Sequence, residues 1–157
     1  SAEEMRAAVM ERMAEATLVV KAAAVADYRP VVVSEQKLKR TGPMTLELAP
    51  TEDILAEVVR RRRAGQLIVG FAAETENRME NGRAKLLRKG ADAIVVNDVT
   101  SDGVGIEADT NAATFLTATK SIEMDELPKR QLADRILDES SYPARLKSII
   151  NSMNTKS

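Results

Sequence analysis

An acid and a base stand close to the end of a predicted strand in the first third of the chain. Residues 18–24 (LVVKAAA) begin with a leucine and two valines, a pattern typical of a short buried strand. The alanines at its end let a ligand approach the backbone. Asp27 follows where an open α/β sheet places its ligand crevice, and Lys37 follows in a segment that Pro30 and Ser34 mark as a loop. One acid and one mobile base at such a place suit a metal-bound phosphate chain.

The side chains that the sequence lacks narrow the chemistry further. The 157 residues include no His and no Cys. Imidazole acid–base chemistry, Ser-His-Asp triads, thiolate nucleophiles and sites with His or Cys metal ligands are therefore excluded. The groups that remain favour charge stabilisation of a reacting phosphate over covalent catalysis. The absence of cysteine also favours a reducing compartment, and we expect the protein in the cytoplasm.

Composition and length are those of one globular domain. Hydrophobic residues make up 44% of the chain and charged residues 30%, and the net charge is -1. A net charge this close to zero does not suggest a basic nucleic-acid-binding surface, and no apolar run is long enough to span a membrane. We expect a single domain over residues 1–157, with a flexible tail at 151–157.

Further strands are expected on either side of the chain's midpoint. The apolar runs at 66–72 (QLIVGFA) and 93–96 (AIVV) predict central strands parallel to the first one. Apolar residues alternate with polar ones over 44–48, which predicts a half-exposed edge strand. Residues 104–107 and 113–118 are expected to pair as a hairpin.

Helices are expected between these strands and after them. The second predicted helix begins at Thr51, with acids in its first turn, and ends in the run Arg60–Arg63, which a helix carboxyl terminus explains better than nucleic-acid binding does. The alternation of strands and helices predicts an α/β, Rossmann-like, three-layer domain with a mainly parallel sheet and an antiparallel element. The predicted helices span residues 2–14, 51–63, 76–89, 127–137 and 143–150.

Four ordered sequence blocks carry a resemblance to a known family. AAAVADYRP (22–30), followed after a short loop by KLKR (37–40), forms the first block. EDIL (52–55), VGFAAET (69–75) and AKLLRKGADAIVVNDV (84–99) follow in order. Together these blocks resemble phosphopantothenate-cysteine ligase, the synthetase of coenzyme A biosynthesis, in the carboxyl-terminal portion of its ligase domain.

The resemblance implies a reaction and its partners. The ligase joins 4'-phosphopantothenate and cysteine through an acyl-cytidylate that forms from CTP, and its products are phosphopantothenoylcysteine, CMP and pyrophosphate. Mg²⁺ is the implied cofactor, although the sequence does not identify its ligands. The family also implies a homodimer, whose contact lies near the predicted antiparallel element around Met44.

The resemblance also implies roles for individual residues. Catalytic roles fall to Lys37 and Asp27, and substrate contacts on the pantothenate side to Ala23 and Ala24. The implied nucleotide-binding residues are Asp27, Lys37, Glu52, Asp53, Ile54, Leu55, Phe71, Lys85 and Lys89.

Without the resemblance, several of these residues have simpler explanations. Phe71 suits core packing, and Lys85 and Lys89, four positions apart on one predicted helix face, suit a solvated surface. Asn97 and Asp98 fall at the expected end of a strand, where they either contact a ligand or cap a turn.

Two departures from the family pattern leave a second function open. The family's upstream glycine-rich turn and its Arg and Asn motif do not occur in this sequence, and Glu52 stands where relatives often have proline. The alternative to a ligase is therefore a non-catalytic CTP-binding or dimerisation fragment of it. A generic dinucleotide-binding dehydrogenase is disfavoured because no GxGxxG turn follows any predicted strand.

Overall fold

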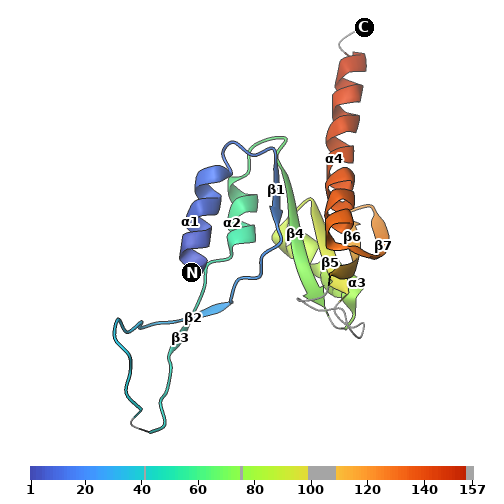
Figure 1. Cartoon of the computed structure of the whole chain (residues 1–157). Coiled ribbons are helices and arrows are strands. Elements are labelled where there is room, and N and C mark those ends of the chain that lie inside the picture. The colour runs from blue at the N-terminus through green and yellow to red at the C-terminus, as the bar shows by residue number, and fades with distance from the viewer. Residues whose placement is uncertain (41, 75, 99–108, 155–157) are drawn as a thin grey trace.

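The computed structural model describes residues 1–40, 42–74, 76–98 and 109–154. A mixed sheet of order β1-β4-β5-β6-β7 runs through its centre (Figure 1). Its strands are β1 (Leu18–Lys21), β4 (Leu67–Glu74), β5 (Ala93–Asp98), β6 (Thr110–Thr117) and β7 (Ser121–Pro128).

The predicted parallel arrangement is confirmed. Strands β1, β4 and β5 lie parallel to one another, whereas β6 runs antiparallel to both β5 and β7. Four of the five strands therefore point in the same direction. The expected first strand ends earlier than predicted, at Lys21, so that the following alanines belong to a loop. Residues 113–117 lie in β6, but their hairpin partner is β7, and residues 104–107 fall outside the described part of the chain.

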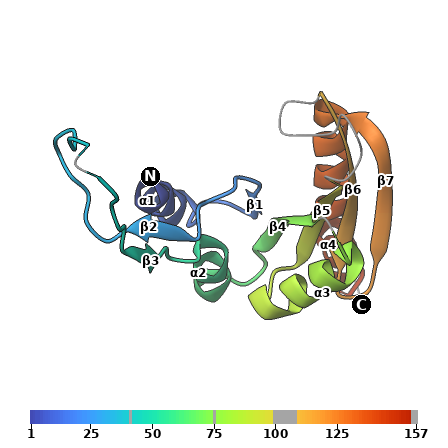
Figure 2. The ribbon, with the colours of Figure 1, turned by 90° about the horizontal axis from the view of Figure 1, so that it is seen from below.

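In the described part of the chain, four helices cover the two faces of the sheet. They are α1 (Ala2–Arg12), α2 (Ile54–Arg61), α3 (Arg78–Lys89) and α4 (Lys129–Asn154). One hydrophobic cluster joins α2 and α3 and the end of α1 to one face, and a second cluster joins α4 to the opposite face. The three layers of the predicted architecture are therefore present, as the view from below also shows (Figure 2).

The alternation of side chains along the strands produces these two clusters. Ile68 and Ile94 pack in the cluster with α2 and α3, while their neighbours Val69 and Val95 pack in the cluster with α4. All four side chains are almost fully buried. Successive side chains along a strand point to opposite faces of the sheet. Because both faces are buried here, apolar residues occupy every position, and the sequence runs are apolar throughout rather than alternately apolar and polar.

Helix ends follow local chemistry, with one correction. Ser1 and Glu4 form a capping box at α1. The N-cap of α2 is Asp53 rather than the expected Thr51, because the Asp53 carboxylate accepts a hydrogen bond from the Ala56 amide. Gly90 ends α3 in the left-handed conformation that glycine adopts without steric cost.

A two-stranded arm projects from the sheet domain (Figures 1 and 2). Its strands β2 (Tyr28–Pro30) and β3 (Leu48–Pro50) are antiparallel and only three residues long. The strand expected over 44–48 is wrong, since only its last residue is extended in a ladder. Among the described residues this sheet contains only these two strands, and an isolated pair of strands gains little stability in water.

The two helices expected near the carboxyl terminus are one. Helix α4 continues without interruption through residues 138–142, where a break was predicted, and through Pro143. A proline removes one backbone hydrogen bond, a loss that a helix of 26 residues tolerates without ending. The backbone of residues 151–154 is helical as well. None of the helices in the described ranges is both long and apolar enough to cross a lipid bilayer.

Candidate functional site

A cavity of about 750 Å³ lies at the carboxyl ends of β1, β4 and β5. Parallel strands place their following loops at a common edge, which is where α/β sheets bind ligands. The lining residues come from the end of β1 and the loop after it, the start of α2, the second half of β4, one face of α3, strands β5 and β6, and the start of α4. They are Lys21, Ala22, Ala23, Ala24, Val25, Asp27, Thr51, Glu52, Asp53, Ile54, Leu55, Phe71, Ala72, Ala73, Lys85, Lys89, Asn97, Asn111 and Lys129.

Close packing brings the start of α2 to this edge. A side-chain carbon added at Gly70 would lie 2.7 Å from a methyl group of Leu55 and 2.8 Å from one of Ile94. The glycine in β4 therefore allows Leu55 to pack directly on the sheet backbone. The loop before α2 is tied to the β1 side, because the Thr51 amide donates to the Asp27 carbonyl at 2.8 Å.

Lysines gather at the end of the cavity beside α2 and α3. Lys89 forms an ion pair with Asp53, the residue that caps α2. Burial alone would raise the pKa of Asp53, but the hydrogen bonds from Lys89 and from the Ala56 amide, together with the charges of Lys89 and Lys21, lower it overall. Lys21 donates to the Ala23 carbonyl at 2.9 Å. We call this part of the cavity, with Lys21, Lys85 and Lys89, the lysine end.

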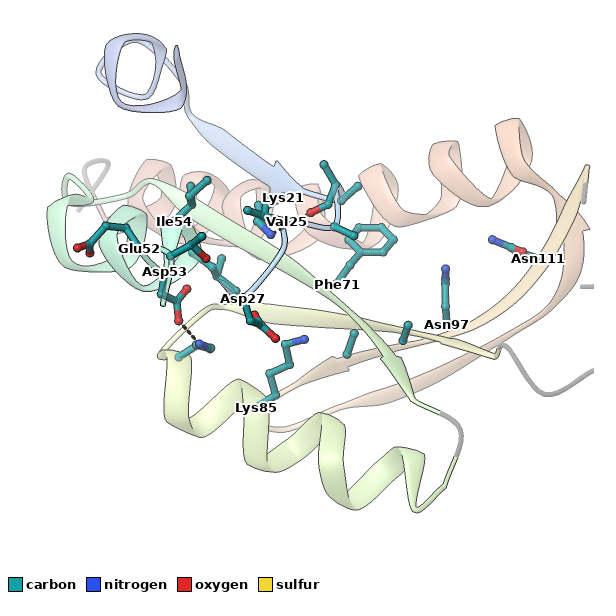
Figure 3. A pocket seen from close by; sticks show the side chains of 18 of the residues that line it. Lys21, Val25, Asp27, Glu52, Asp53, Ile54, Phe71, Lys85, Asn97 and Asn111 are labelled. Atoms are coloured by element: carbon teal, nitrogen blue, oxygen red, sulfur yellow. Dashed lines mark hydrogen bonds and ion pairs between the residues drawn. The ribbon is translucent and has the colours of Figure 1, made fainter. Parts of the chain in front are cut away.

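Carboxylates also line the lysine end. Asp27 points toward Lys85, and Asp53 is joined to Lys89 (Figure 3). Within the described part of the chain, no group of three or more Asp or Glu side chains is placed to hold a metal ion. A single carboxylate such as that of Asp27 fits instead a cation that brings most of its oxygen ligands with it, as Mg²⁺ bound to a nucleotide does.

The other end of the cavity is lined by an aromatic ring and two carboxamides. Asn97 lies opposite Ala73 on β4 and Ala113 on β6. Phe71 is two positions before Ala73 on β4, and Asn111 is two positions before Ala113 on β6. Residues two apart on a strand point to the same face, so Phe71 and Asn111 project from the same face of the sheet as Asn97. We call Phe71, Asn97 and Asn111 the amide end. The Asn97 Oδ1 atom is buried there without a hydrogen-bond partner among the described residues.

The structure brings together all but one of the residues to which the family resemblance assigns a role. Ala23, Ala24, Asp27, Phe71, Lys85, Lys89 and the block Glu52–Leu55 all line the cavity. Lys37 does not: it is exposed on the arm, between β2 and β3. Asn97, for which a turn cap was the alternative, lies inside β5 and faces the cavity (Figure 3).

Sequence reasoning missed four polar residues of the lining. Lys21 lies within the predicted strand over 18–24 and Thr51 at the start of the predicted helix over 51–63, but nothing in their local pattern indicates a site. Asn111 and Lys129 are brought in by the pairing of β6 with β5 and by the start of α4. The signal that could have found them is the sheet register, which single-sequence patterns do not fix.

Known proteins match the chain over most of its length. Residues 1–142 match the DNA/pantothenate metabolism flavoprotein C-terminal domain. A cysteine/cysteine sulfinic acid decarboxylase from an unknown prokaryotic organism is 41% identical over 128 residues, which is 81% of this chain and 36% of that protein. The coenzyme A biosynthesis bifunctional protein CoaBC of Bacillus subtilis (strain 168) is 42% identical over 141 residues, which is 88% of this chain and 34% of that protein.

A solved structure agrees with these matches. The crystal structure of the C-terminal domain of a CoaBC protein superposes with a TM-score of 0.73 at 34% identity, over 92% of this chain and 63% of that one. This chain spans about a third of the length of the curated relatives that it matches. The matched range, the identities and the shared fold show that the chain belongs to the DNA/pantothenate metabolism flavoprotein C-terminal domain family, as its sequence blocks predicted.

Proposed function

We propose that this domain serves the phosphopantothenate-cysteine ligase reaction of coenzyme A biosynthesis, with CTP as the activating nucleotide. The observation that carries the proposal is the cavity itself: in a relative of the CoaBC proteins, one pocket holds a cluster of lysines at one end and an aromatic, carboxamide-lined recess at the other. A nucleoside triphosphate has the same division into an anionic chain and a flat base.

The proposed reaction proceeds in two transfers. A carboxylate oxygen of 4'-phosphopantothenate attacks the α-phosphorus of CTP, and the bond to the bridging oxygen breaks, releasing pyrophosphate. The amine of cysteine then attacks the acyl carbon of the acyl-cytidylate, CMP leaves, and the amine loses a proton. Because phosphoryl transfer depends mainly on positioning and charge neutralisation, the absence of His and Cys is no obstacle.

The lysine end is assigned to the triphosphate. Lys85 and Lys89 stand on one face of α3 and would hold the outer phosphates as point charges. The first backbone amides of α2, at Ile54 and Leu55, lie at the same end and add the positive end of a helix dipole. Asp53 pairs with Lys89 until a phosphate takes its place, which keeps the lysine oriented.

Mg²⁺ would enter this site with the nucleotide. Asp27 is the carboxylate placed to contact it, since Asp53 already pairs with Lys89. When bound, the cation neutralises charge on the phosphate oxygens. Asp27 would thereby fix the depth at which the triphosphate sits.

Lys37 and the alanines after β1 are assigned to the reacting end of the substrates. Ala23 and Ala24 line the cavity with exposed backbone, which suits contact with the pantothenate chain. Lys37 lies outside the cavity on the arm, so its proposed catalytic role requires the arm to swing or a second copy of the chain to present it.

We further propose that the protein is cytoplasmic and that it forms a homodimer.

The first transfer can be tested without cysteine. We expect radioactive pyrophosphate to exchange into CTP when Mg²⁺ and 4'-phosphopantothenate are present, and no exchange when phosphopantothenate is omitted. Lys89→Gln should reduce the exchange rate by about ten-fold or more, whereas Lys120→Gln, in the turn between β6 and β7, should not. Binding of CTP without any exchange would favour the alternative, a non-catalytic CTP-binding or dimerisation fragment.

A further inference from the structure

The amide end of the cavity offers hydrogen-bond donors rather than a balanced set of donors and acceptors. Figure 3 shows the side-chain nitrogens of Asn97 and Asn111 directed into the cavity, with the ring of Phe71 beside them. Lys129, at the start of α4, is a further cavity-lining donor on the β6 side. The acidic lining residues Asp27, Glu52 and Asp53 lie at the opposite end (Figure 3).

The buried oxygen of Asn97 explains why its amide is held this way. Oδ1 is inaccessible to solvent and has no partner in the described part of the chain. If the amide turned over, its nitrogen would take the buried place with two unpartnered N–H groups. Buried donors without partners are rarer than under-satisfied carbonyl oxygens, because each lost donor costs free energy. The orientation with nitrogen toward the cavity is therefore the more stable one.

The sheet register fixes the spacing of the two carboxamides. Asn97 is paired with Ala113, and Asn111 is the diagonal neighbour two residues earlier on β6. Diagonal neighbours on one face lie roughly 7–8 Å apart at the backbone, which lets two asparagine side chains converge on adjacent atoms of one ligand. Ala73 and Ala113, which flank Asn97, are too small to fill the space above the sheet.

Two converging donors distinguish one pyrimidine from the other. Cytosine presents its O2 and its N3 as adjacent acceptors, whereas uracil has an N–H group at position 3. A donor facing that N–H group makes no hydrogen bond and is left unpaired, which is the kind of mismatch that gives strong discrimination. Phe71 lies on the same face, where its ring can pack against a flat base.

We propose that Asn97 and Asn111 read the O2 and N3 edge of the nucleobase and select cytosine over uracil. This inference rests on the proposed nucleotide-dependent function and names the residues that set its specificity. The donor in this assignment is the Asn97 side-chain nitrogen, which faces the cavity while Oδ1 is buried without a partner among the described residues.

The test compares CTP, UTP and inorganic tripolyphosphate, each with Mg²⁺, by calorimetric titration. In Asn97→Asp and Asn111→Asp a donor becomes an acceptor-only carboxylate, which suits the N–H of uracil. Substitution of the residue that faces N3 should lower the preference for CTP over UTP by about ten-fold or more. Substitution of the residue that faces O2 should weaken CTP and UTP alike, because both bases carry that oxygen, and neither change should alter tripolyphosphate binding. The matched control is Gln131→Glu, the same amide-to-acid change on the exposed first turn of α4, and its preference should equal that of the unmodified chain.

Every outcome decides between the two claims. If the unmodified chain prefers CTP and both variants keep that preference, the base-reading role is wrong while the nucleotide function stands. Equal binding of CTP and UTP by the unmodified chain also overturns the base-reading role. Binding of neither nucleotide overturns the proposed function and this inference together. If circular dichroism shows that Asn97→Asp does not fold, the half-buried Asn111→Asp decides the question alone, because unchanged affinity for both CTP and UTP overturns the base-reading role.

Discussion

At the scale of single residues, Asp53 serves both the fold and the site. Its carboxylate caps α2 through the Ala56 amide and pairs with Lys89 from α3. A carboxylate with a lowered pKa remains charged at neutral pH, so both interactions persist there. One side chain therefore links the start of one helix to the end of another across the lysine end of the cavity.

Substitutions at Asp53 can separate capping from charge. Asp53→Asn keeps an oxygen for the Ala56 amide, and we expect its free energy of unfolding to fall by no more than about 0.5 kcal/mol. Asp53→Ala removes the cap and should cost about 1 kcal/mol. Urea unfolding followed by circular dichroism measures both. Equal losses in the two variants would mean that the ion pair with Lys89, and not the cap, carries the effect.

Local patterns identified part of the site at this scale, and for identifiable reasons. Some site residues fall in continuous sequence motifs that resemble those of a known family, and these residues line the cavity: Asp27, Phe71, Lys85 and Lys89. Asn111 lies in no such block. Its place depends on the pairing of β6 with β5, which is a long-range property. Lys37, by contrast, lies in a recognisable motif but outside the cavity, because a local motif does not determine the direction in which its loop extends.

At the scale of elements, α3 lies against the sheet through a glycine. A side-chain carbon added at Gly82 would lie 2.6 Å from a methyl group of Val96 and 2.7 Å from one of Leu116. These contacts are shorter than packed carbon atoms allow. The close approach keeps Lys85 and Lys89, on the next turns of α3, beside the cavity.

Gly82→Ala should therefore destabilise the protein. Alanine normally stabilises a helix by about 0.5–1 kcal/mol relative to glycine, but here the overlap should cost about 1–3 kcal/mol. We expect a net loss in the free energy of unfolding, measured by urea titration. Arg83→Ala, an exposed neighbour in the same helix, should change it by less than about 0.5 kcal/mol. A stabilised Gly82→Ala variant would contradict the close approach.

An ion-pair cluster joins α1 to α2. The carboxylate of Glu57, only 4% exposed, accepts from Arg6 Nε at 2.6 Å and Nη2 at 2.8 Å, and pairs with Arg61 at 2.9 Å. The hydrogen bonds from Arg6 lower the pKa of Glu57, and the charges of Arg6 and Arg61 act in the same direction, although burial opposes them. A lowered folded-state pKa means that protonation favours the unfolded chain.

Glu57 should therefore make stability depend on acid pH. Its contribution is present above the ordinary glutamate pKa of about 4.5 and is lost as the pH falls through the lower folded-state value. The difference in urea midpoint between the unmodified chain and Glu57→Gln should be large near pH 7 and small near pH 3. Glu47→Gln, which is exposed on the arm, should show no such change. A difference that is constant with pH would rule out the ion pair as its cause.

Elements were predictable where burial is complete and local. The apolar runs of β4 and β5 have a clear sequence signal because each strand is covered on both faces, whereas β1 is an edge strand whose residues are only partly buried. The arm was misplaced because its alternating residues meet no core, and alternation alone does not create a partner strand. The register of β6 and β7 and the continuation of α4 through Pro143 depend on contacts that a local pattern does not contain.

At the scale of the whole molecule, the arm carries apolar side chains into solvent. Val32 is 80% exposed and Val33 79%, and Leu38, Met44 and Leu46 are also exposed. Several exposed apolar side chains on one projecting segment are typical of a protein interface. The arm also projects away from the sheet, where it can reach a second copy of the chain (Figure 2).

We expect the arm to hold a homodimer. Sedimentation equilibrium should give twice the monomer mass of 17.1 kDa, and Val32→Glu should shift the chain to monomer because it places a charge in the contact. Leu87→Glu, a similarly exposed apolar residue on α3, is the control and should leave the dimer intact. A monomeric unmodified chain, or a dimer that survives Val32→Glu, would count against an arm-mediated contact.

The central claim is that the cavity at the strand ends is a nucleoside triphosphate site. The most direct measurement is calorimetric titration of CTP and of ATP, with Mg²⁺, into the unmodified chain, Lys89→Gln and the surface control Lys120→Gln. We predict selective binding of CTP that falls by about ten-fold or more in Lys89→Gln and is unchanged in Lys120→Gln. Binding of neither nucleotide, or CTP binding that Lys89→Gln leaves intact, would contradict the account.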